Sequence, residues 1–307
     1  INFGHNVIFL GKIHPSLDPI YAIEGPEIID SNKTGTIYLF ESSELNELDI
    51  TTNNAIVTIN GIIGTQLGSS FAANGDIDGD GYNDFLIIRP ENEKINVYLG
   101  KDYDTWKTDT ENNASFSLIS TYLPSEDTVN KQIATSIASI DGDLNGDGFD
   151  DIVIGSPLAQ VNSIPGQVDI LFGKSHFGSG NTVLSTTSNK TITGVSPEDH
   201  TKFGYSVEII NDINQDGYDE LIIGDFQGGS NPQGKFATLI YGSNNLDAFS
   251  YENADAFFYS PNYDTATKTD SSGFSETITS IGDINNDGYG DFAISAPYED
   301  NDKGAIY

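Results

Sequence analysis

The six-residue string Asp-x-Asp/Asn-x-Asp-Gly occurs four times, and it constrains the fold more than any other feature of the chain. The copies begin at Asp76, Asp143, Asp212 and Asp283, at intervals of 67, 69 and 71 residues. Repetition with a nearly fixed period is typical of proteins built from stacked copies of one supersecondary unit. We therefore expect the chain to consist of such copies.

Short apolar runs surround each string at regular distances. One run follows each string, at residues 84–88, 151–154, 220–223 and 291–294. Other runs lie before the string and at two places after it, as at residues 205–210, 236–241 and 255–259. The runs are short, rich in β-branched and aromatic residues, and bounded by Gly or Pro, as strands are. Four short strands per repeat, without a convincing helix, predict an all-β chain: a β-propeller of four-stranded antiparallel blades.

A fifth, degenerate copy begins at the N-terminus. Phe3-Gly4 matches Phe203-Gly204, and Lys12 follows Phe3 at the distance at which Asp212 follows Phe203. Because Lys12 stands where the first carboxylate should be, we expect no metal in this copy. We expect a single propeller region over residues 1–307, with repeats at approximately 1–62, 63–128, 129–198, 199–269 and 270–307, the last one incomplete.

The four strings open nine-residue loops that fit calcium chemistry. We name them loop A (76–84), loop B (143–151), loop C (212–220) and loop D (283–291), and number their positions 1 to 9. Calcium takes about 6–8 oxygen ligands. Positions 1, 3 and 5 offer carboxylate or amide oxygens, position 7 offers a backbone carbonyl, and an acid at position 9 closes the site. Gly at position 6 permits the sharp turn.

This pattern predicts about four Ca²⁺ ions, one in each loop. The predicted ligands are, in chain order, Asp76, Asp78, Asp80, Tyr82 and Asp84; Asp143, Asn145, Asp147, Phe149 and Asp151; Asp212, Asn214, Asp216, Tyr218 and Glu220; Asp283, Asn285, Asp287, Tyr289 and Asp291. The residue at position 7 is aromatic in every loop. Backbone coordination does not require a ring, so we assign these rings to packing between blades.

Two other interpretations of the loops are weaker. An EF-hand needs a bidentate Glu at position 12 and flanking helices. Here position 12 is Ile87, Ile154, Ile223 or Ile294, each in a strand-like run. A single string could be an ordinary turn, because Asp, Asn and Gly are turn residues. Four strings in constant phase, each closed by an acid, favour calcium.

The chain resembles the FG-GAP repeats of integrin α-subunit propellers. The "FG" element is similar to Phe3-Gly4 and Phe203-Gly204, and the "GAP" element to Gly155-Ser156-Pro157 and Ser295-Ala296-Pro297. The resemblance implies an extracellular module with calcium loops on one rim and ligand binding on the other. Integrin propellers have seven blades, so the five repeats would be part of such a ring. The chain departs from the pattern at Glu220, where Asp is usual, and this substitution implies a weaker or reshaped site.

Charge and composition exclude several classes of protein. The chain has 13 Lys+Arg against 46 Asp+Glu, a formal net charge of −33. This balance excludes nucleic-acid binding, which needs positive charge, and disfavours docking on an anionic membrane. The 37% of hydrophobic residues suffices for a packed core, and no apolar run is long enough to span a bilayer. With no cysteine, the chain has neither disulfides nor a thiolate site.

We therefore expect a non-catalytic, extracellular or cell-surface module for adhesion or for recognition of a protein or glycan ligand, without direct membrane insertion. One alternative is a structural subunit, in which a strand from another chain or segment completes the last blade. A calcium-dependent polysaccharide lyase is a weaker alternative, because the chain has a single arginine, Arg89, and four scattered histidines. The only tryptophan, Trp106, is either packed in the core or part of a glycan-stacking surface.

Overall fold

The structure is a computed structural model of the 307-residue chain. It describes residues 7–25, 28–29, 32–33, 35–46, 51–61, 71–89, 94–107, 114–119, 136–137, 140–161, 164–183, 187–194, 202–225, 236–261 and 272–307. The chain divides into two compact units. Unit 1 comprises residues 1–121 and 173–187, and unit 2 comprises residues 122–172 and 188–307.

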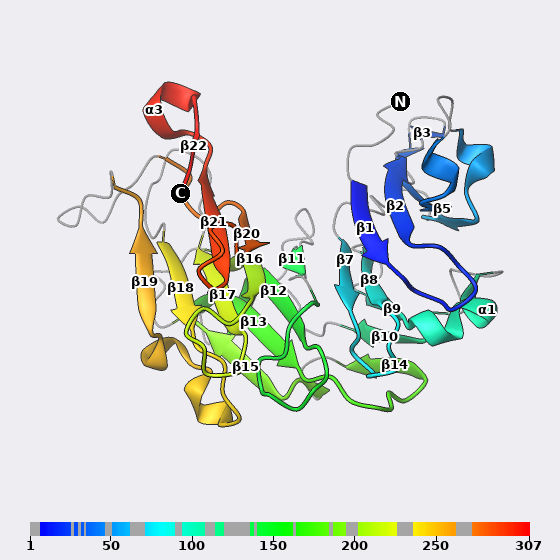
Figure 1. Ribbon diagram of the computed structural model, residues 1–307. Helices are drawn as coiled ribbons and strands as arrows, with labels where there is room; N and C mark the ends of the chain where they lie inside the picture. Colours follow the sequence, from blue (N-terminus) through cyan, green and yellow to red (C-terminus); the bar gives the residue numbers. More distant parts are fainter. Residues whose placement is uncertain are drawn as a thin grey trace. The chain divides into compact units, whose positions relative to one another are not determined.

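Unit 1 contains two large antiparallel sheets (Figure 1). The first has the order β1-β2-β5-β6, and in the second β7, β8, β9 and β10 follow one another in the same way. A fifth strand, β14, pairs in parallel with β10, from Phe116–Gly180 to Ile119–Val183. The strands are β1 (Val7–Gly11), β2 (Ile20–Gly25), β3 (Ile28–Ile29), β4 (Asn32–Lys33), β5 (Thr36–Glu41), β6 (Val57–Asn60), β7 (Phe71–Gly75), β8 (Asp84–Arg89), β9 (Lys94–Tyr98), β10 (Phe116–Ile119) and β14 (Gly180–Val183).

Unit 2 contains three further groups of antiparallel strands. Strands β11, β12, β13 and β15 form one, β16 to β19 form the next, and a single parallel pair, Gly166–Phe203, joins the two. In the third, β20, β21 and β22 form a three-stranded sheet. The strands are β11 (Ser136–Ile137), β12 (Ile152–Val161), β13 (Ile164–Leu171), β15 (Lys190–Thr193), β16 (Phe203–Ile210), β17 (Glu220–Asp225), β18 (Phe236–Ile240), β19 (Ala256–Tyr259), β20 (Ile278–Gly282), β21 (Asp291–Ala296) and β22 (Ala305–Ile306).

The second strand of a blade is the apolar run that the sequence marks, and β17 shows why it is apolar. All six of its residues are buried, and it pairs with β16 on one edge and β18 on the other. Its two faces contribute to different clusters, because Leu221 packs with Val153 and Val168 while Ile222 packs with Phe274 and Ile278. A strand that is buried on both faces needs a nearly continuous apolar run. The predicted all-β fold of four-stranded antiparallel blades is confirmed.

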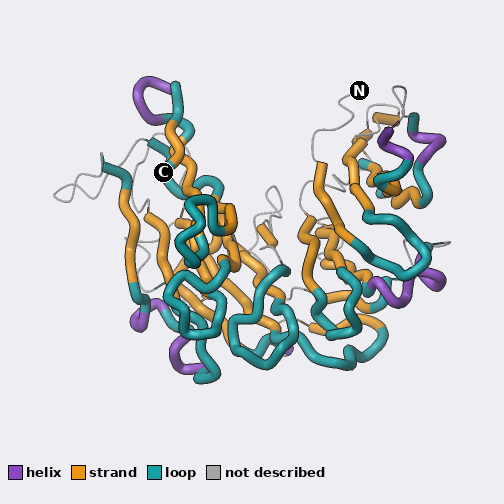
Figure 2. The backbone as a smooth tube through the Cα atoms, viewed as in Figure 1, coloured by secondary structure: helices purple, strands orange, loops and turns teal. Residues whose placement is uncertain are grey.

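Helices are short wherever the structure describes them (Figure 2). The α-helices α1 (Tyr103–Trp106) and α3 (Glu299–Asp302) have four residues each, so no described helix could cross a membrane. The 3-10 turns are η1 (Glu44–Asn46), η2 (Thr52–Asn54), η4 (Gly100–Asp102), η5 (Leu246–Ala248) and η6 (Tyr251–Asn253). The sequence did not predict α1, because a single helical turn is too short to give a periodic pattern.

Trp106 belongs to the core of unit 1. Its side chain is fully buried, and its indole N–H donates to the Leu99 carbonyl at 3.0 Å. The rings of Phe85, Tyr98 and Tyr103 meet the indole edge-on, with centroids 5.4, 5.5 and 5.1 Å away. Of the two predictions for Trp106, packing in the core is therefore confirmed, and an exposed glycan-stacking surface at this residue is excluded.

A glycine lies two residues after the end of the third strand in three repeats, at Gly100, Gly173 and Gly242. At Gly242 the neighbouring backbone lies too close for any side chain. An added Cβ would lie 2.2 Å from the Asp219 carbonyl oxygen and 2.8 Å from that of Leu144. The next residue, Ser243, donates its N–H to the Leu144 carbonyl at 2.8 Å. The glycine thus lets this blade lie against the loop before it.

Replacing Gly242 by Ala is expected to destabilise the chain by about 1–3 kcal/mol, because backbone atoms cannot yield as a flexible side chain can. Urea unfolding monitored by circular dichroism measures the change. Gly178→Ala is the control, because a Cβ at Gly178 meets nothing within 4 Å. Equal midpoints for the two variants would contradict the proposed close approach.

Candidate metal centres

Loops A to D occupy the same place in their sheets. Each connects the first strand of a sheet to the second: β7 to β8, β11 to β12, β16 to β17 and β20 to β21. Position 9 is the residue that begins, or directly precedes, the second strand. Loops A, B and C are therefore anchored at their C-terminal end in a buried strand, whereas β21, which follows loop D, is only partly buried.

The first aspartate of each loop organises the backbone of the turn. In loop A, Asp76 accepts the N–H of Asp80 at 2.9 Å on one oxygen and that of Gly81 at 2.7 Å on the other. The same two bonds form at the first aspartate of loops B, C and D. The position 5 carboxylate accepts the N–H of position 7, as from Tyr82 to Asp80 at 2.9 Å. These bonds hold the carboxylates and leave further lone pairs available to a cation.

The turn needs two residues in the left-handed region. Position 6 is Gly in every loop, with φ between 86° and 90°. Position 4 also has positive φ: 71° at Gly79, 72° at Gly146, 61° at Gln215 and 61° at Asn286. The invariant glycine at position 6 predicted the first of these, whereas position 4 varies in residue type and was not predicted. Three of the four residues at position 4 are Gly or Asn, the types that adopt positive φ most readily, and this bias is visible in the sequence.

Position 9 closes each loop onto its own start. Its carboxylate accepts the N–H of position 2 in all four loops, at 2.9 Å for Asp84, 2.8 Å for Asp151, 2.7 Å for Glu220 and 3.0 Å for Asp291. Asp84, Asp151 and Glu220 are fully buried. The longer Glu220 side chain makes the same closing bond as the aspartates, so the substitution preserves the geometry of the turn.

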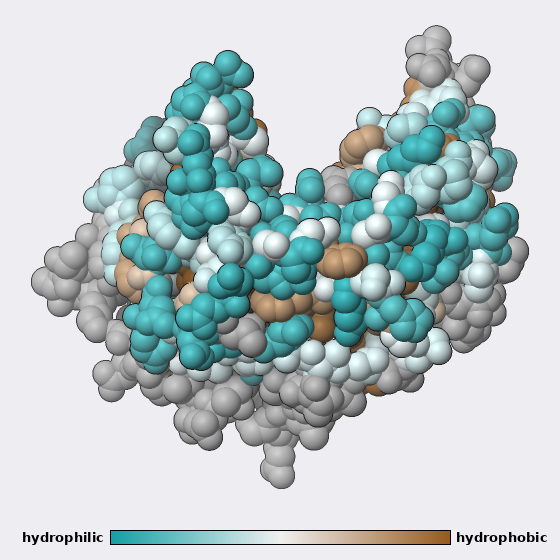
Figure 3. Space-filling view, turned by 60° about the horizontal axis from the view of Figure 1, so that its bottom comes forward, coloured by the Kyte–Doolittle hydropathy of each residue, from teal (hydrophilic) through white to brown (hydrophobic). Residues whose placement is uncertain are grey.

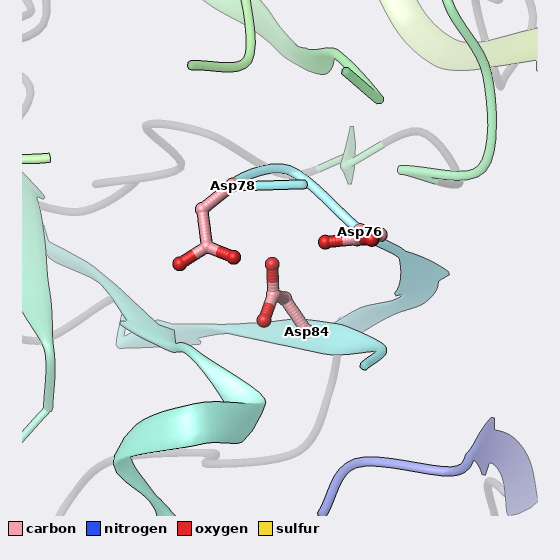
Figure 4. Close-up of side chains that lie close together, drawn as sticks. All are labelled: Asp76, Asp78 and Asp84. Atoms are coloured by element: carbon pink, nitrogen blue, oxygen red, sulfur yellow. The ribbon is translucent and has the colours of Figure 1, made fainter. Parts of the chain in front are cut away.

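The acids of two loops converge. Figure 4 shows the carboxylates of Asp76, Asp78 and Asp84 directed toward one another, and their closest oxygens all lie within 4.8 Å. Asp212, Asp216 and Glu220 in loop C meet the same distance. The acids of loops B and D, which the structure also describes, are not drawn together to this distance. The predicted position 7 carbonyls of Tyr82, Phe149, Tyr218 and Tyr289 remain predictions.

Three oxygens in loops A and C are buried and accept no hydrogen bond: Asp78 Oδ1, Asp80 Oδ2 and Glu220 Oε1. A buried carboxylate oxygen without a partner costs free energy. A divalent cation would remove that cost by bonding directly to the oxygen, so the donor set fits a hard cation.

Burial raises the pKa of two of the closing acids, Asp84 and Glu220. The pKa of Asp84 rises to about 9, mainly because the side chain is desolvated; the N–H of Gly100 partly offsets this, and nearby Asp78 adds to it. The pKa of Glu220 rises to about 8 for the same leading reason. Without a cation, these groups hold a proton at neutral pH in the folded chain and lose it in the unfolded chain.

This difference predicts a pH dependence. The folded-state pKa values exceed the ordinary value, so the metal-free chain should lose stability as pH rises from about 4 to about 9. Calcium needs the ionised carboxylates, so its binding should release protons at pH 7 and tighten as pH rises through this window. Calorimetry in two buffers of different ionisation enthalpy measures the release. Binding heats that are independent of the buffer would contradict the prediction.

Adjacent loops are joined through their backbones. The N–H of position 8 donates to the position 1 carbonyl of the preceding repeat: Asn83 to Lys12 at 3.0 Å, Asp219 to Asp143 at 3.1 Å and Gly290 to Asp212 at 3.3 Å. Asp219 adds its side chain, which accepts the N–H of Asp143 at 2.8 Å and that of Asp212 at 3.0 Å. This role of position 8 was not predicted from the sequence, because its partner lies in another repeat.

The aromatic residue at position 7 packs against the preceding loop in one case. A Cβ at Gly146 of loop B would lie 2.6 Å from the ring of Tyr218 in loop C, so this ring covers the neighbouring glycine. Tyr289 in loop D is 43% exposed. The assignment of these rings to packing between blades therefore describes Tyr218 better than Tyr289.

Comparison with known proteins agrees with this architecture. Residues 137–171 and 277–307 match the FG-GAP repeat model. The chain is 28% identical to integrin alpha-11 of Homo sapiens over 211 residues, which is 63% of this chain and 15% of that protein. It is 28% identical to integrin alpha-8 of Mus musculus over 171 residues, 53% of this chain and 13% of that protein. It is 27% identical to integrin alpha-PS2 of Drosophila melanogaster over 188 residues, 58% of this chain and 12% of that protein.

The resemblance to FG-GAP repeats is thus confirmed, and the chain is similar to integrin α subunits over more than half its length. The two matched segments contain β11 to β13 and β20 to β22, and so include loops B and D. The chain spans only about one seventh of the length of these relatives.

Proposed function

We propose that this chain is a calcium-stabilised, non-catalytic module for adhesion or for recognition of an extracellular protein or glycan. The observation that carries the proposal is the convergence of acids in loops A and C, where three carboxylate oxygens are buried and accept no hydrogen bond. Loops B and D, which repeat the same string, lie in the segments that match the FG-GAP repeat. The chain's similarity to integrin α subunits supports a surface or extracellular location and a role without catalysis.

Calcium suits these loops better than a smaller or softer ion. The side-chain donors are carboxylate and amide oxygens, which hard cations prefer, and no sulfur is available in a chain without Cys or Met. The ligands in each loop would be the residues at positions 1, 3, 5, 7 and 9. When bound, the ion neutralises the clustered negative charge. The chain's own residues orient the site, because the N–H groups of positions 2, 5, 6 and 7 already fix the carboxylates.

The five repeats are proposed to act as five blades, with loops A to D on the repeats that bind metal. The described surface in Figure 3 is mainly hydrophilic, with small hydrophobic areas. With a net charge of −33, a basic or calcium-bridged ligand fits this surface better than an acidic one.

Two measurements test the proposal. Calorimetric titration of the metal-free chain should show about four calcium sites with affinities on the order of 10⁻⁴ to 10⁻³ M, the range of extracellular modules. Screening against extracellular matrix proteins and a glycan array should then give binding that calcium enhances and chelation abolishes. The absence of calcium binding up to about 10 mM would refute the metal half of the proposal, because that exceeds the weakest class of site.

One observation favours a second candidate, a structural subunit completed by strand addition. The outer edge of β10 accepts β14, a strand from the distant segment 173–187, in parallel register. Edge strands elsewhere in the chain could receive a strand from another chain in the same way. A particle mass that rises with protein concentration, measured by light scattering, would favour this function over the monomeric module.

A further inference from the structure

Loop A differs from the other loops in the charge of its predicted ligands. Position 3 is Asp78 in loop A and Asn in loops B, C and D, so the ligand positions of loop A carry four acids where those of the others carry three. The extra charge has a partner, because the Lys101 ammonium forms an ion pair with Asp78 Oδ2. Counting Lys101, the ligand set of loop A has the same formal charge as those of the other three loops when all their carboxylates are ionised.

The lysine is held in place by its backbone. Lys101 follows Gly100, whose N–H donates to Asp84 Oδ1 at 2.8 Å. A Cβ at Gly100 would lie 2.3 Å from the Ile13 carbonyl oxygen and 2.7 Å from that of Asn83, so this segment is pressed against loop A and the preceding repeat. The backbone from which the Lys101 side chain extends is therefore fixed by the same contacts that close the loop.

The ion pair is unequal in its exposure. The Asp78 side chain is fully buried, while the Lys101 side chain is 40% exposed. The second oxygen of Asp78, Oδ1, is buried and unpartnered. Lys101 thus pairs with Oδ2 of Asp78 and leaves Oδ1 available to a cation.

We propose that Lys101 is a built-in counter-cation of loop A, which keeps the metal-free loop folded and lowers its affinity for calcium. The proposal rests on calcium binding as the function of the loop. A calcium ion at Asp78 meets the ammonium as a like charge, so the ion pair must weaken or part before the ion is fully bound. The other three loops need no such residue, because Asn at position 3 adds no charge.

The two effects have opposite signs, and this makes the proposal testable. In Lys101→Gln, the metal-free protein should unfold about 2–4 °C lower, as expected for the loss of one partly exposed ion pair in a unit of this size. Loop A in the same variant should bind calcium about fivefold more tightly. A purely structural lysine would give the first effect without the second.

Hydrogen exchange is measured by mass spectrometry across a calcium titration. The exchange of the peptide that covers residues 76–84 gives the calcium midpoint of loop A separately from those of loops B, C and D. Lys174→Gln is the matched control. Lys174 also follows a glycine after a third strand and lies beside loop A, because its N–H donates to the Ile77 carbonyl at 2.9 Å. Its ammonium, however, lies 5.1 Å from the centre of the Phe177 ring. That control removes the same charge and should leave the calcium midpoint of loop A unchanged.

Asp78→Asn gives loop A the residue type of the other loops at position 3 and provides a second test. In this background, Lys101→Gln should shift the calcium midpoint by less than half the wild-type effect. An unchanged midpoint in Lys101→Gln alone, or an equal shift in the Asp78→Asn background, would overturn the role of Lys101 while calcium binding stands. Failure of loop A to bind calcium in every protein, wild type included, would overturn the proposed function and this inference together.

Discussion

Chelation of calcium is expected to lower the free energy of unfolding by about 6 kcal/mol when the ion is present at about ten times its dissociation constant. An ion that binds only the folded state adds about 1.4 kcal/mol per site under that condition, and four sites add accordingly. The ligand positions of the four loops hold 13 of the 46 acids of the chain, and their mutual repulsion in the absence of metal acts in the same direction. Differential scanning calorimetry with and without a chelator measures the change.

The controls for this prediction separate binding from screening. Magnesium at equal ionic strength should restore only part of the stability, because it demands a tighter octahedral geometry than these loops offer. Asp216→Asn, which removes one acid from the group in loop C, should reduce the calcium effect by about one site's share, roughly 1–2 kcal/mol. Equal melting temperatures with calcium and with chelator would show that the loops bind no calcium under these conditions.

Replacing Trp106 by Ala is expected to destabilise the chain by about 3–5 kcal/mol, the range for removal of a large buried aromatic side chain. The indole fills the space between three rings, and its N–H satisfies the Leu99 carbonyl, so the variant loses packing and leaves a buried acceptor unpaired. Chemical denaturation followed by far-UV circular dichroism gives the value, because the variant lacks the fluorescent probe.

Trp106→Phe is the graded control for this prediction. It keeps an aromatic ring and loses the N–H donor, so it should cost less than Trp106→Ala. Because Trp106 is fully buried, neither variant should alter the binding of any ligand found by the proposed screen, except through loss of folded protein. Loss of that binding in a fully folded variant would contradict a purely structural role.

The sequence predicted the fold class because the repeat imposes it. Buried strands, turns and loops recur in one phase, so each repeat supports the interpretation of the others. The second strand of each sheet follows its loop as expected, since a strand buried on both faces, such as β17, needs an apolar run that is visible without a structure. In loops A and C, acids that the string marks as ligands do converge.

The features that escaped prediction depend on contacts between distant residues. Lys101 lies 23 residues from Asp78, and Asp219 lies 76 residues from the N–H of Asp143 that it accepts. Strand β14 pairs with β10 although it follows β13 in the chain. None of these pairings has a local pattern, because a surface lysine or aspartate looks the same in a sequence whether its partner is water or another loop.

The backbone bonds between repeats have a consequence for how such an array can change. The carbonyl of Asp212 accepts the N–H of Gly290 in the next repeat, while the side chain of the same residue belongs to the candidate ion site of loop C. Every amino acid carries that carbonyl, and Lys12 uses it toward Asn83 without any carboxylate. A substitution at position 1 can therefore remove or restore the ion of one repeat while the backbone hydrogen bond to the neighbouring repeat persists. The number of bound ions can thus change one blade at a time without separating the blades.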